Sequence, residues 1–393
     1  MNRAVLASEV QKYIQQQLNQ DLNFLIFKKS PFSTVTMHEL VKQISGKKNA
    51  YTKLPTWFET SGIYYPEKVS LEQTSSEKTA SYKSSLIKGK SLVDLTGGFG
   101  VDSFYFSKQF DAVIHLEKNE SLSEIVSFNY KQLGASNIEC KTEDAETFLH
   151  RNQKTFDWIY ADPSRRDDHL GKVFLLSECT PNIPELLDII WQRTQNLLLK
   201  TSPLLDIQQG INELQHVKEV HVVAVKNEVK ELIWILEKDY KGSIKIFSVN
   251  IEKEKTDFFS FFYQEEKETK VFFSNPLNYL YEPYAAVLKS GAFKTISQKY
   301  KVSKIGINSH LYTSEALIQF PGRIFEIQES LPFHKKTLKK RFSKAKAHVT
   351  TRNFPWSVAK LRKELQILDG GEVYLFFTTD LKDNHLVIIC KKL

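Results

Sequence analysis

The stretch Ser91–Asp102, which reads SLVDLTGGFGVD, constrains the fold more than any other part of the chain. Leu92, Val93 and Leu95 form a short apolar run that is typical of a buried strand. Glycines follow at once, and glycine permits positive φ and lets a ligand approach the backbone closely. The residues after the glycines can begin a helix. Strand, glycine turn and helix form the nucleotide-binding end of a doubly wound α/β sheet, so the sequence predicts a Rossmann-like domain.

An acidic residue in the first predicted strand and another at the end of the second indicate which nucleotide this domain binds. Gly98–Ser103 matches the dinucleotide fingerprint G-x-G-x-x-G except at its last position, which is a weak signal. Asp94 lies inside the strand, where a carboxylate can accept from the ammonium of a methionyl group but would repel a pyrophosphate. Glu117 ends the next apolar run, Ala112–Leu116, and can accept both ribose hydroxyls. Further along, Phe156–Ala161 reads as a fourth strand that ends on Asp162-Pro163-Ser164-Arg165-Arg166.

Elements in this order resemble the class I S-adenosylmethionine-dependent methyltransferases. The resemblance implies S-adenosylmethionine as the cofactor, with the glycine loop at the methionyl group, an acid at the ribose and another near the adenine. It implies a catalytic site after the fourth strand, at Asp162, Pro163 and Arg165. The implied cofactor-binding residues are Asp94, Thr96, Gly97, Gly98, Gly100, Asp102, Glu117, Asp144 and Asp162.

The segment before the glycine-loop strand contains further pocket candidates. Thr74-x-x-Glu77 has the pattern of a capping box, so a helix is expected to begin near Ser75. In the methyltransferase fold this segment often lines the cofactor pocket. The candidates are Glu72, Gln73, Ser76 and Lys83, and the alternative is a connecting helix with a polar face.

The positive charge of the chain is concentrated at its end. The 393 residues carry a net charge of +8. Residues 320–393 contain 15 Lys and Arg against 7 Asp and Glu, which accounts for the whole excess. A basic module attached to a neutral enzyme suggests a polyanionic substrate, most simply nucleic acid. A chain of this length is expected to contain two or three domains.

The cysteines and the hydropathy exclude several classes of protein. Cys140, Cys179 and Cys390 are far apart, so neither a zinc site nor a disulfide framework is indicated. The N-terminal residues lead us to expect no signal peptide, and no apolar stretch approaches the roughly 20 residues that a membrane span needs. We therefore expect a cytoplasmic protein with no metal and no membrane contact.

The C-terminal part resembles the THUMP-like domain that closes a group of bacterial, RNA-modifying methyltransferases. The residues that carry this resemblance are Thr351–Pro355, Leu361–Lys363 and Asp369–Gly371. The segment near Glu282-Pro283-Tyr284 resembles the small ferredoxin-like insert of the same proteins. The predicted domains are 1–62, helical; 63–270, the methyltransferase domain; 271–319, ferredoxin-like; and 320–393, the THUMP-like domain, a small sheet with two helices.

The resemblance implies methylation of tRNA or rRNA, and the residues favour a base nitrogen. Enzymes that methylate base amines commonly carry Asp/Asn-Pro-Pro-aromatic after the fourth strand, where the acid accepts from the amine and the ring stacks on the base. Here Ser164-Arg165 replaces Pro-aromatic, so Arg165 and Arg166 could stack or hold a phosphate, or pair with surface acids. Carbon-5 methylation is disfavoured because Lys200-Thr201-Ser202-Pro203, after the fifth strand, contains no thiol.

Other functions stay open. Ribose 2′-O-methyltransferases use a Lys-Asp-Lys-Glu set, and Lys83, Asp162, Lys200 and Glu228 occur at comparable places. The remaining alternatives are a small-molecule or protein methyltransferase and a non-catalytic RNA-binding protein. The sequence does not indicate an oligomeric state.

The basic run 335–346 is the candidate RNA anchor. At helical spacing, Leu338 and Phe342 share one face and can pack on the small sheet, and the lysines then face the solvent. The bland alternative is a solvated charged face. The predicted RNA-binding residues are Lys335, Lys336, Lys339, Lys340 and Arg352.

Overall fold

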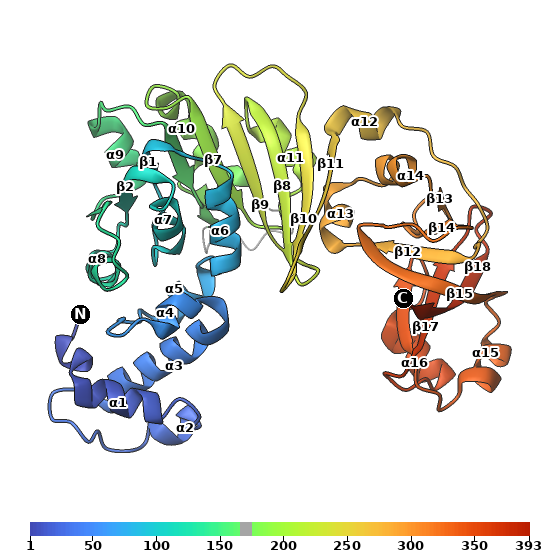
Figure 1. The fold of residues 1–393 in the computed structure, drawn as a ribbon, viewed down its shortest axis with the longest axis horizontal. Coiled ribbons are helices and arrows are strands. Elements are labelled where there is room, and N and C mark those ends of the chain that lie inside the picture. The colour runs from blue at the N-terminus through green and yellow to red at the C-terminus, as the bar shows by residue number, and fades with distance from the viewer. Residues whose placement is uncertain (166–174) are drawn as a thin grey trace. The chain divides into compact units, whose positions relative to one another are not determined.

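A computed structural model describes residues 1–165 and 175–393, except for the side chain of Arg165. Its ribbon is shown in Figure 1. The chain forms two compact units. The first comprises Met1–Lys218 and Glu231–Lys241, and the second comprises Glu219–Lys230 and Gly242–Leu393. The predicted division at residues 62, 270 and 319 remains a prediction.

The first unit has a parallel sheet in the strand order β9-β7-β4-β1-β2-β3. The glycine-loop strand β1 is central and pairs in parallel with β2 and β4, and only β9 runs antiparallel to its neighbour β7. The chain reverses its direction of travel between β1 and β4, which is the switch point where open α/β sheets bind ligands. The strands are β1 (Gly89–Asp94), β2 (Phe110–Leu116), β3 (Ile138–Lys141), β4 (Trp158–Ala161), β7 (Asn196–Thr201) and β9 (Glu228–Glu237), with the short pair β5 (Ser164–Arg165) and β6 (Cys179–Thr180).

Helices cover this sheet and form the N-terminal region, which is helical as predicted. Apolar side chains of the N-terminal helices share one core with α7 and α8, where Trp57 packs edge-on against Phe104. The helices are η1 (Arg3–Leu6), α1 (Ser8–Gln16), α2 (Leu22–Leu25), α3 (Met37–Lys53), α4 (Pro55–Glu59), α5 (Lys68–Gln73), α6 (Glu77–Ser85), α7 (Val101–Phe106), α8 (Glu120–Gln132), α9 (Ala145–Arg151), η2 (Leu176–Glu178), α10 (Ile183–Ile190) and α11 (Ile207–Glu213).

The predicted capping box before α6 is wrong. The residue that caps α6 is Ser76, whose side chain accepts from the backbone N–H of Thr79. Glu77 accepts instead from the backbone N–H and the hydroxyl of Thr56 and from the hydroxyl of Tyr105. These partners lie in α4 and α7, so the carboxylate of Glu77 ties α6 to its neighbours and is not available to the N-cap.

The second unit contains the strands β8, β10 and β11 and a separate sheet of seven strands, β13-β14-β12-β15-β18-β17-β16. The small ferredoxin-like segment supplies β12 to β14, and β12 pairs with β15 of the C-terminal domain. Its elements are β8 (Val217–Val225), β10 (Lys245–Ile251), β11 (Thr256–Phe262), α12 (Tyr263–Glu268), β12 (Tyr279–Pro283), α13 (Ala285–Ser290), α14 (Thr295–Tyr300), β13 (Ser303–Lys304), β14 (Tyr312–Ser314), β15 (Gly322–Pro332), α15 (Lys335–Phe342), β16 (His348–Arg352), α16 (Val358–Leu365), β17 (Val373–Thr379) and β18 (His385–Lys392).

The C-terminal domain has the predicted architecture of two helices on a small sheet. Leu338 and Phe342 of α15 and Leu361 and Leu365 of α16 are buried in one core with side chains of β17 and β18. The predicted face of α15 therefore packs against the sheet, and its lysines are exposed.

Candidate active site

A cavity of about 1430 Å³ opens at the carboxyl ends of β1, β2, β4 and β7. It lies where the strand order reverses, which is where the fold is expected to bind its ligand. Nearly all of the predicted cofactor residues line it; among them, only Gly100 does not. The predicted residues that line the cavity are Asp94, Thr96, Gly97, Gly98, Asp102, Glu117, Asp144, Asp162 and Pro163.

The glycine loop needs its glycines for different reasons. Gly98 has φ +54° and open space where a side chain would project, so its backbone is accessible from the cavity. Gly100 has φ +82° and caps α7, and a Cβ there would lie 2.2 Å from the hydroxyl of Tyr130. Gly100 is therefore required by packing and conformation.

Two of the acids predicted to bind the cofactor, Glu117 and Asp144, line the cavity from different elements. Glu117 follows β2, and its Oε1 accepts from the backbone N–H of Asn119 at 2.7 Å. Asp144 caps α9, where Oδ1 accepts from the N–H of Thr147 at 2.9 Å and Oδ2 from its hydroxyl at 2.7 Å. The hydrogen bonds from Thr147 lower the pKa of Asp144. Because both of its oxygens are bonded, Asp144 is held in a fixed position beside the cavity.

The carboxylates that line the cavity fit a cationic ligand. Asp94, Glu117, Glu143 and Asp162 all line it, and a pyrophosphate would be repelled by this concentration of carboxylates. S-adenosylmethionine carries an ammonium and a sulfonium, which carboxylates attract. The residues present therefore fit the methyl donor better than a dinucleotide.

Asp162 pairs with Lys200, which the sequence suggested only for the alternative of ribose 2′-O methylation. Its backbone N–H donates to Thr96 Oγ1 at 2.6 Å, which ties the end of β4 to the glycine loop. Its Oδ2 accepts from Lys200 Nζ at 2.5 Å. Burial opposes the charged form of Lys200, but the carboxylates of Asp162, Glu231 and Asp102 outweigh it and raise the pKa of Lys200. Lys200 therefore stays protonated at the edge of the cavity.

A second ion pair, between Lys83 and Glu231, is fully buried behind the cavity. Lys83 Nζ lies 2.8 Å from Glu231 Oε1, 3.0 Å from Ser75 Oγ and 3.2 Å from Asp102 Oδ1. Asp102 also accepts from the hydroxyl of Tyr160 at 2.8 Å. Burial raises the pKa of Asp102, but the ammonium groups of Lys83 and Lys200 outweigh it, so the net shift is downward. These contacts fix Asp102 as an anion at the cavity wall.

Several other candidates lie elsewhere. Of the segment before β1, Gln73 lines the cavity, whereas Lys83 is buried behind it. Glu228 belongs to the second unit, where it pairs with Lys230, so Glu231 is the glutamate that meets Lys83. The side chain of Arg165 and all of Arg166 lie outside the described residues.

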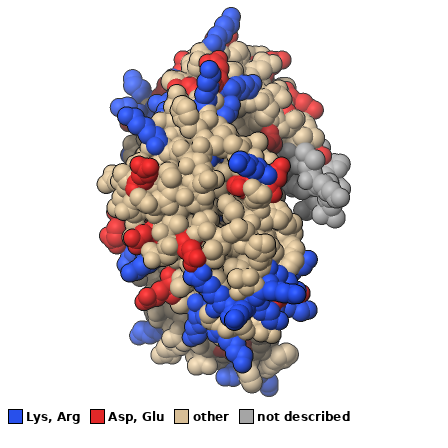
Figure 2. Space-filling model, turned by 90° about the vertical axis from the view of Figure 1, so that its right-hand side faces the viewer, with Lys and Arg blue, Asp and Glu red and all other residues tan. Residues whose placement is uncertain are grey.

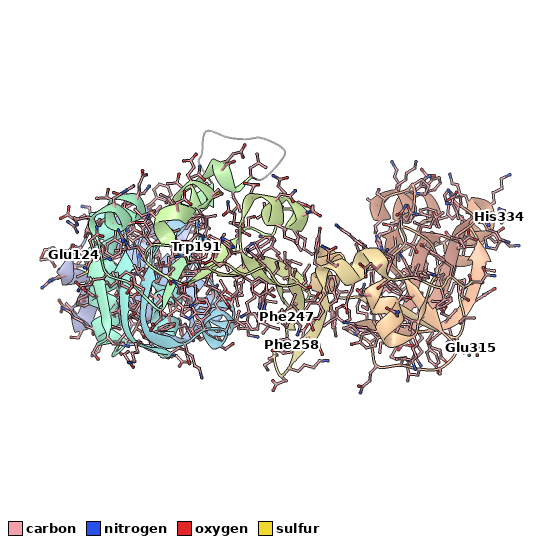
Figure 3. All side chains as sticks on the ribbon, turned by 90° about the horizontal axis from the view of Figure 1, so that it is seen from above. Glu124, Trp191, Phe247, Phe258, Glu315 and His334 are labelled. Carbon is pink, nitrogen blue, oxygen red and sulfur yellow. The ribbon has the colours of Figure 1, made fainter. Side chains whose placement is uncertain are left out.

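The predicted RNA-binding residues lie in the second unit. Lys336, Lys339 and Lys340 are exposed on α15, and Lys335 pairs with Glu364 of α16 at 2.5 Å. Figure 2 shows Lys and Arg side chains gathered in the lower half of its view, where Figure 1 places α15 and α16. His334, which precedes α15, marks one end of the domain in Figure 3. Arg352 is instead held by the buried carboxylate of Glu282 at 2.7 Å.

Within residues 1–165 and 175–393, no group of His, Cys, Asp or Glu is arranged to hold a metal ion. No helix in this part of the chain is long and apolar enough to cross a membrane.

Comparison with known proteins identifies the family. Residues 279–321 match a ferredoxin-like domain, and residues 322–392 match a THUMP domain-like domain. No curated protein sequence matches the chain. An rRNA methylase from Streptococcus thermophilus and a methyltransferase from Geobacter sulfurreducens align with 41% and 42% of this chain and with 94% and 78% of their own. Their identities are 16% and 14%, and both TM-scores are 0.31.

One solved structure matches nearly the whole chain. The "putative methyltransferase" from Porphyromonas gingivalis W83 is 31% identical, and the match covers 99% of this chain and 98% of that one with a TM-score of 0.89. The chain therefore belongs to the family of this Porphyromonas gingivalis protein, with a class I methyltransferase fold followed by ferredoxin-like and THUMP-like domains.

Proposed function

We propose that this protein is an S-adenosylmethionine-dependent methyltransferase that modifies a nucleotide of tRNA or rRNA, on a base nitrogen. The observation that carries the proposal is the carboxylate-lined cavity at the switch point of the sheet, where the glycine loop, Glu117 and Asp162 meet. The name of the Porphyromonas gingivalis relative supports the same class of reaction.

The residues of the cavity would divide the work between cofactor and acceptor. When bound, S-adenosylmethionine supplies an activated methyl group on its sulfonium. Asp94 would accept from the methionyl ammonium, and Glu117 would accept from the ribose hydroxyls. Asp162, held by Thr96 and Lys200, would accept a hydrogen bond from the acceptor amine and direct its lone pair toward the methyl group.

Protonation of Lys200 favours a base amine over a ribose hydroxyl. Ribose methylation needs a base that removes the hydroxyl proton, and a protonated lysine cannot do so. The raised pKa of Lys200 therefore disfavours it in this role. An exocyclic amine already has a lone pair and needs positioning. The 2′-O hypothesis remains the second candidate, because two members of its Lys-Asp-Lys-Glu set, Lys200 and Asp162, meet at the cavity. Nucleoside mass spectrometry separates the two products.

RNA is proposed as the substrate because of the C-terminal domain. The THUMP-like match and the exposed lysines of α15 both lie in this module. Two alternatives are a methyltransferase that acts on a small molecule or a protein, and an RNA-binding protein without catalytic activity. Assays of cofactor binding, RNA binding and methyl transfer distinguish them.

Calorimetry with purified protein tests cofactor binding. We expect saturable binding of S-adenosylmethionine, weakened by Glu117→Ala, which removes the ribose acceptor. Gly98→Arg should abolish it, because the side chain would enter the cavity and φ of +54° is strained for arginine. Val69→Ala, at an exposed side chain outside the cavity lining, serves as the control. A flat titration of folded wild type would remove the methyltransferase proposal.

Replacing Lys335, Lys336, Lys339 and Lys340 with glutamine tests the RNA anchor. Phosphate contacts release counterions, so wild-type affinity for RNA should fall steeply with salt. Lys335 already pairs with Glu364, so we expect only the other three lysines to contact phosphates. The slope of log affinity against log salt should therefore decrease in magnitude by about three, which is about one for each of these lysines. Fluorescence anisotropy with labelled tRNA over a salt series measures this slope.

The matched control for the α15 lysines removes the same charge elsewhere. Lys28, Lys29, Lys253 and Lys270 are exposed, and replacing these four with glutamine should leave most of the slope intact. Equal slopes for the α15 variant and wild type would show that α15 does not anchor RNA.

A further inference from the structure

Asp94 depends on a short chain of buried hydrogen bonds. It is 1% exposed, and its Oδ1 accepts from the backbone N–H of Thr96 at 3.0 Å. Its Oδ2 accepts from the hydroxyl of Ser103 at 2.6 Å. Ser103 Oγ in turn lies 3.1 Å from His115 Nδ1, and both of these side chains are fully buried. A buried carboxylate is stable only with such donors.

A count of protons assigns the tautomer of His115. The one proton of the Ser103 hydroxyl goes to Asp94, and that of the Tyr130 hydroxyl goes to the carbonyl of Gly100 at 2.9 Å. Both hydroxyl oxygens face His115 Nδ1, at 3.1 and 3.2 Å. Since neither oxygen has a proton left to donate, Nδ1 must carry one. Burial lowers the pKa of His115 to about 3, so the ring is neutral and Nε2 is bare.

The glycine loop fixes the position of this ring. A Cβ on Gly97 would lie 2.1 Å from His115 Cε1, so the imidazole packs against the face of Gly97. His115 on β2 is thereby held under the loop that the cofactor approaches.

We propose that His115 is a positioning residue that acts through Ser103 to keep Asp94 ionised for the ammonium of S-adenosylmethionine. This inference rests on the proposed function and adds a residue to it. If Asp94 took up a proton, it would donate to Ser103, and Ser103 would then donate to His115 Nδ1. The imidazole proton would have to move to Nε2, which has no hydrogen-bond partner among the described residues. The unsatisfied N–H makes that state costly, so His115 favours the carboxylate.

The burial of Asp94 and the charged groups around it set the pH at which Asp94 loses its proton. Burial raises the pKa of Asp94 most, the carboxylates of Asp102 and Asp162 raise it further, and the hydrogen bonds from Ser103 and Thr96 lower it, giving about 7. His115, Tyr130 and Tyr160 also face it and are neutral near this pH, because burial lowers the pKa of the histidine and raises those of the tyrosines. Binding of an ammonium needs the carboxylate, so affinity is expected to be complete at higher pH and to be lost as the pH falls through about 7.

Titration of S-adenosylhomocysteine into the full chain by calorimetry, from about pH 5.5 to about pH 8.5, tests the inference. His115→Phe should move the midpoint of the affinity profile upward by about one pH unit, so that binding is about tenfold weaker near neutral pH and recovers at high pH. Tyr130→Phe removes the other hydroxyl that faces His115 Nδ1 and keeps the hydrogen bond from Ser103 to Asp94. It should therefore leave the midpoint unchanged.

A purely structural role for His115 predicts a different result. His115→Phe would then weaken binding by the same factor at every pH, which would overturn the inference. Should this variant not fold, Ser103→Ala interrupts the same chain and also removes the hydrogen bond to Asp94, so the midpoint should move upward by at least as much. Nitrogen NMR of the wild type gives a second readout without ligand: the Nδ1–H form is expected, and the Nε2–H form would overturn the inference. Absence of binding by wild type at every pH would instead contradict the proposed function.

Discussion

Asp162→Ala is expected to lower the rate of methyl transfer at least about 100-fold while leaving the affinity for S-adenosylmethionine within a few-fold. Asp162 follows β4 at the cavity, and it contacts Lys200 and Thr96. Its loss removes the acceptor that orients the amine, an interaction made at the reacting centre, so the effect should appear in kcat. Single-turnover transfer of a labelled methyl group and calorimetry measure the two quantities separately.

Two further variants separate the carboxylate from its surroundings. Asp162→Asn keeps an oxygen acceptor but removes the charge that pairs with Lys200, so we expect an intermediate rate. Lys200→Met removes the partner of Asp162 and tests whether the ion pair is needed to hold it. If Asp162→Ala transfers methyl groups as fast as wild type, Asp162 has no part in the reaction.

Lys83→Met is expected to reduce the free energy of unfolding of the first unit by about 3–5 kcal/mol. The ammonium of Lys83 is completely buried and contacts the carboxylates of Glu231 and Asp102, which are 2% and 9% exposed. Without it, the two carboxylates remain buried, and the ammonium of Lys200 still acts on both of them. Urea denaturation followed by tryptophan fluorescence reports on this unit, because four of the five tryptophans belong to it.

The pH dependence and a matched control distinguish a charge effect from lost packing. In the variant, the pKa of Glu231 should rise further above its unfolded value, so protonation relieves the loss and the deficit should shrink as the pH falls. Lys83→Met combined with Glu231→Gln should recover part of the stability. Lys68→Met breaks an exposed pair with Glu72 and should cost less than about 1 kcal/mol. A loss for Lys83→Met no larger than this control would contradict the burial argument.

Local patterns in the sequence predicted much of the fold. The helix over 335–342 buries the face that its apolar spacing indicated, because Leu338 and Phe342 repeat at one helical turn. The glycine loop was recognised because strand, glycines and helix are contiguous. The third strand, Ile138–Lys141, was not predicted, because it is four residues long and none of its residues is fully buried.

Contacts between distant residues could not be predicted in the same way. Lys83 and Glu231 are 148 positions apart, and Glu228 was the candidate in place of Glu231. The pairing of β9 with β7 over Leu232–Glu237 places the adjoining Glu231 near the end of β7. His115 looked like one polar residue in an apolar strand, and its role depends on Gly97 and Ser103 in other elements. The pairing of Arg352 with Glu282, 70 positions away, could not be predicted either, and RNA binding by Arg352 stays a prediction.

Transfer of a labelled methyl group from S-adenosylmethionine to RNA tests the central claim most directly. RNA from a strain that lacks the gene would be incubated with the purified protein, digested and analysed by nucleoside mass spectrometry, with Asp162→Ala as the control. We predict one new N-methylated base that wild-type protein forms and the control does not. If protein that binds the cofactor leaves this RNA unlabelled, or labels it equally with Asp162→Ala, the proposed function is contradicted.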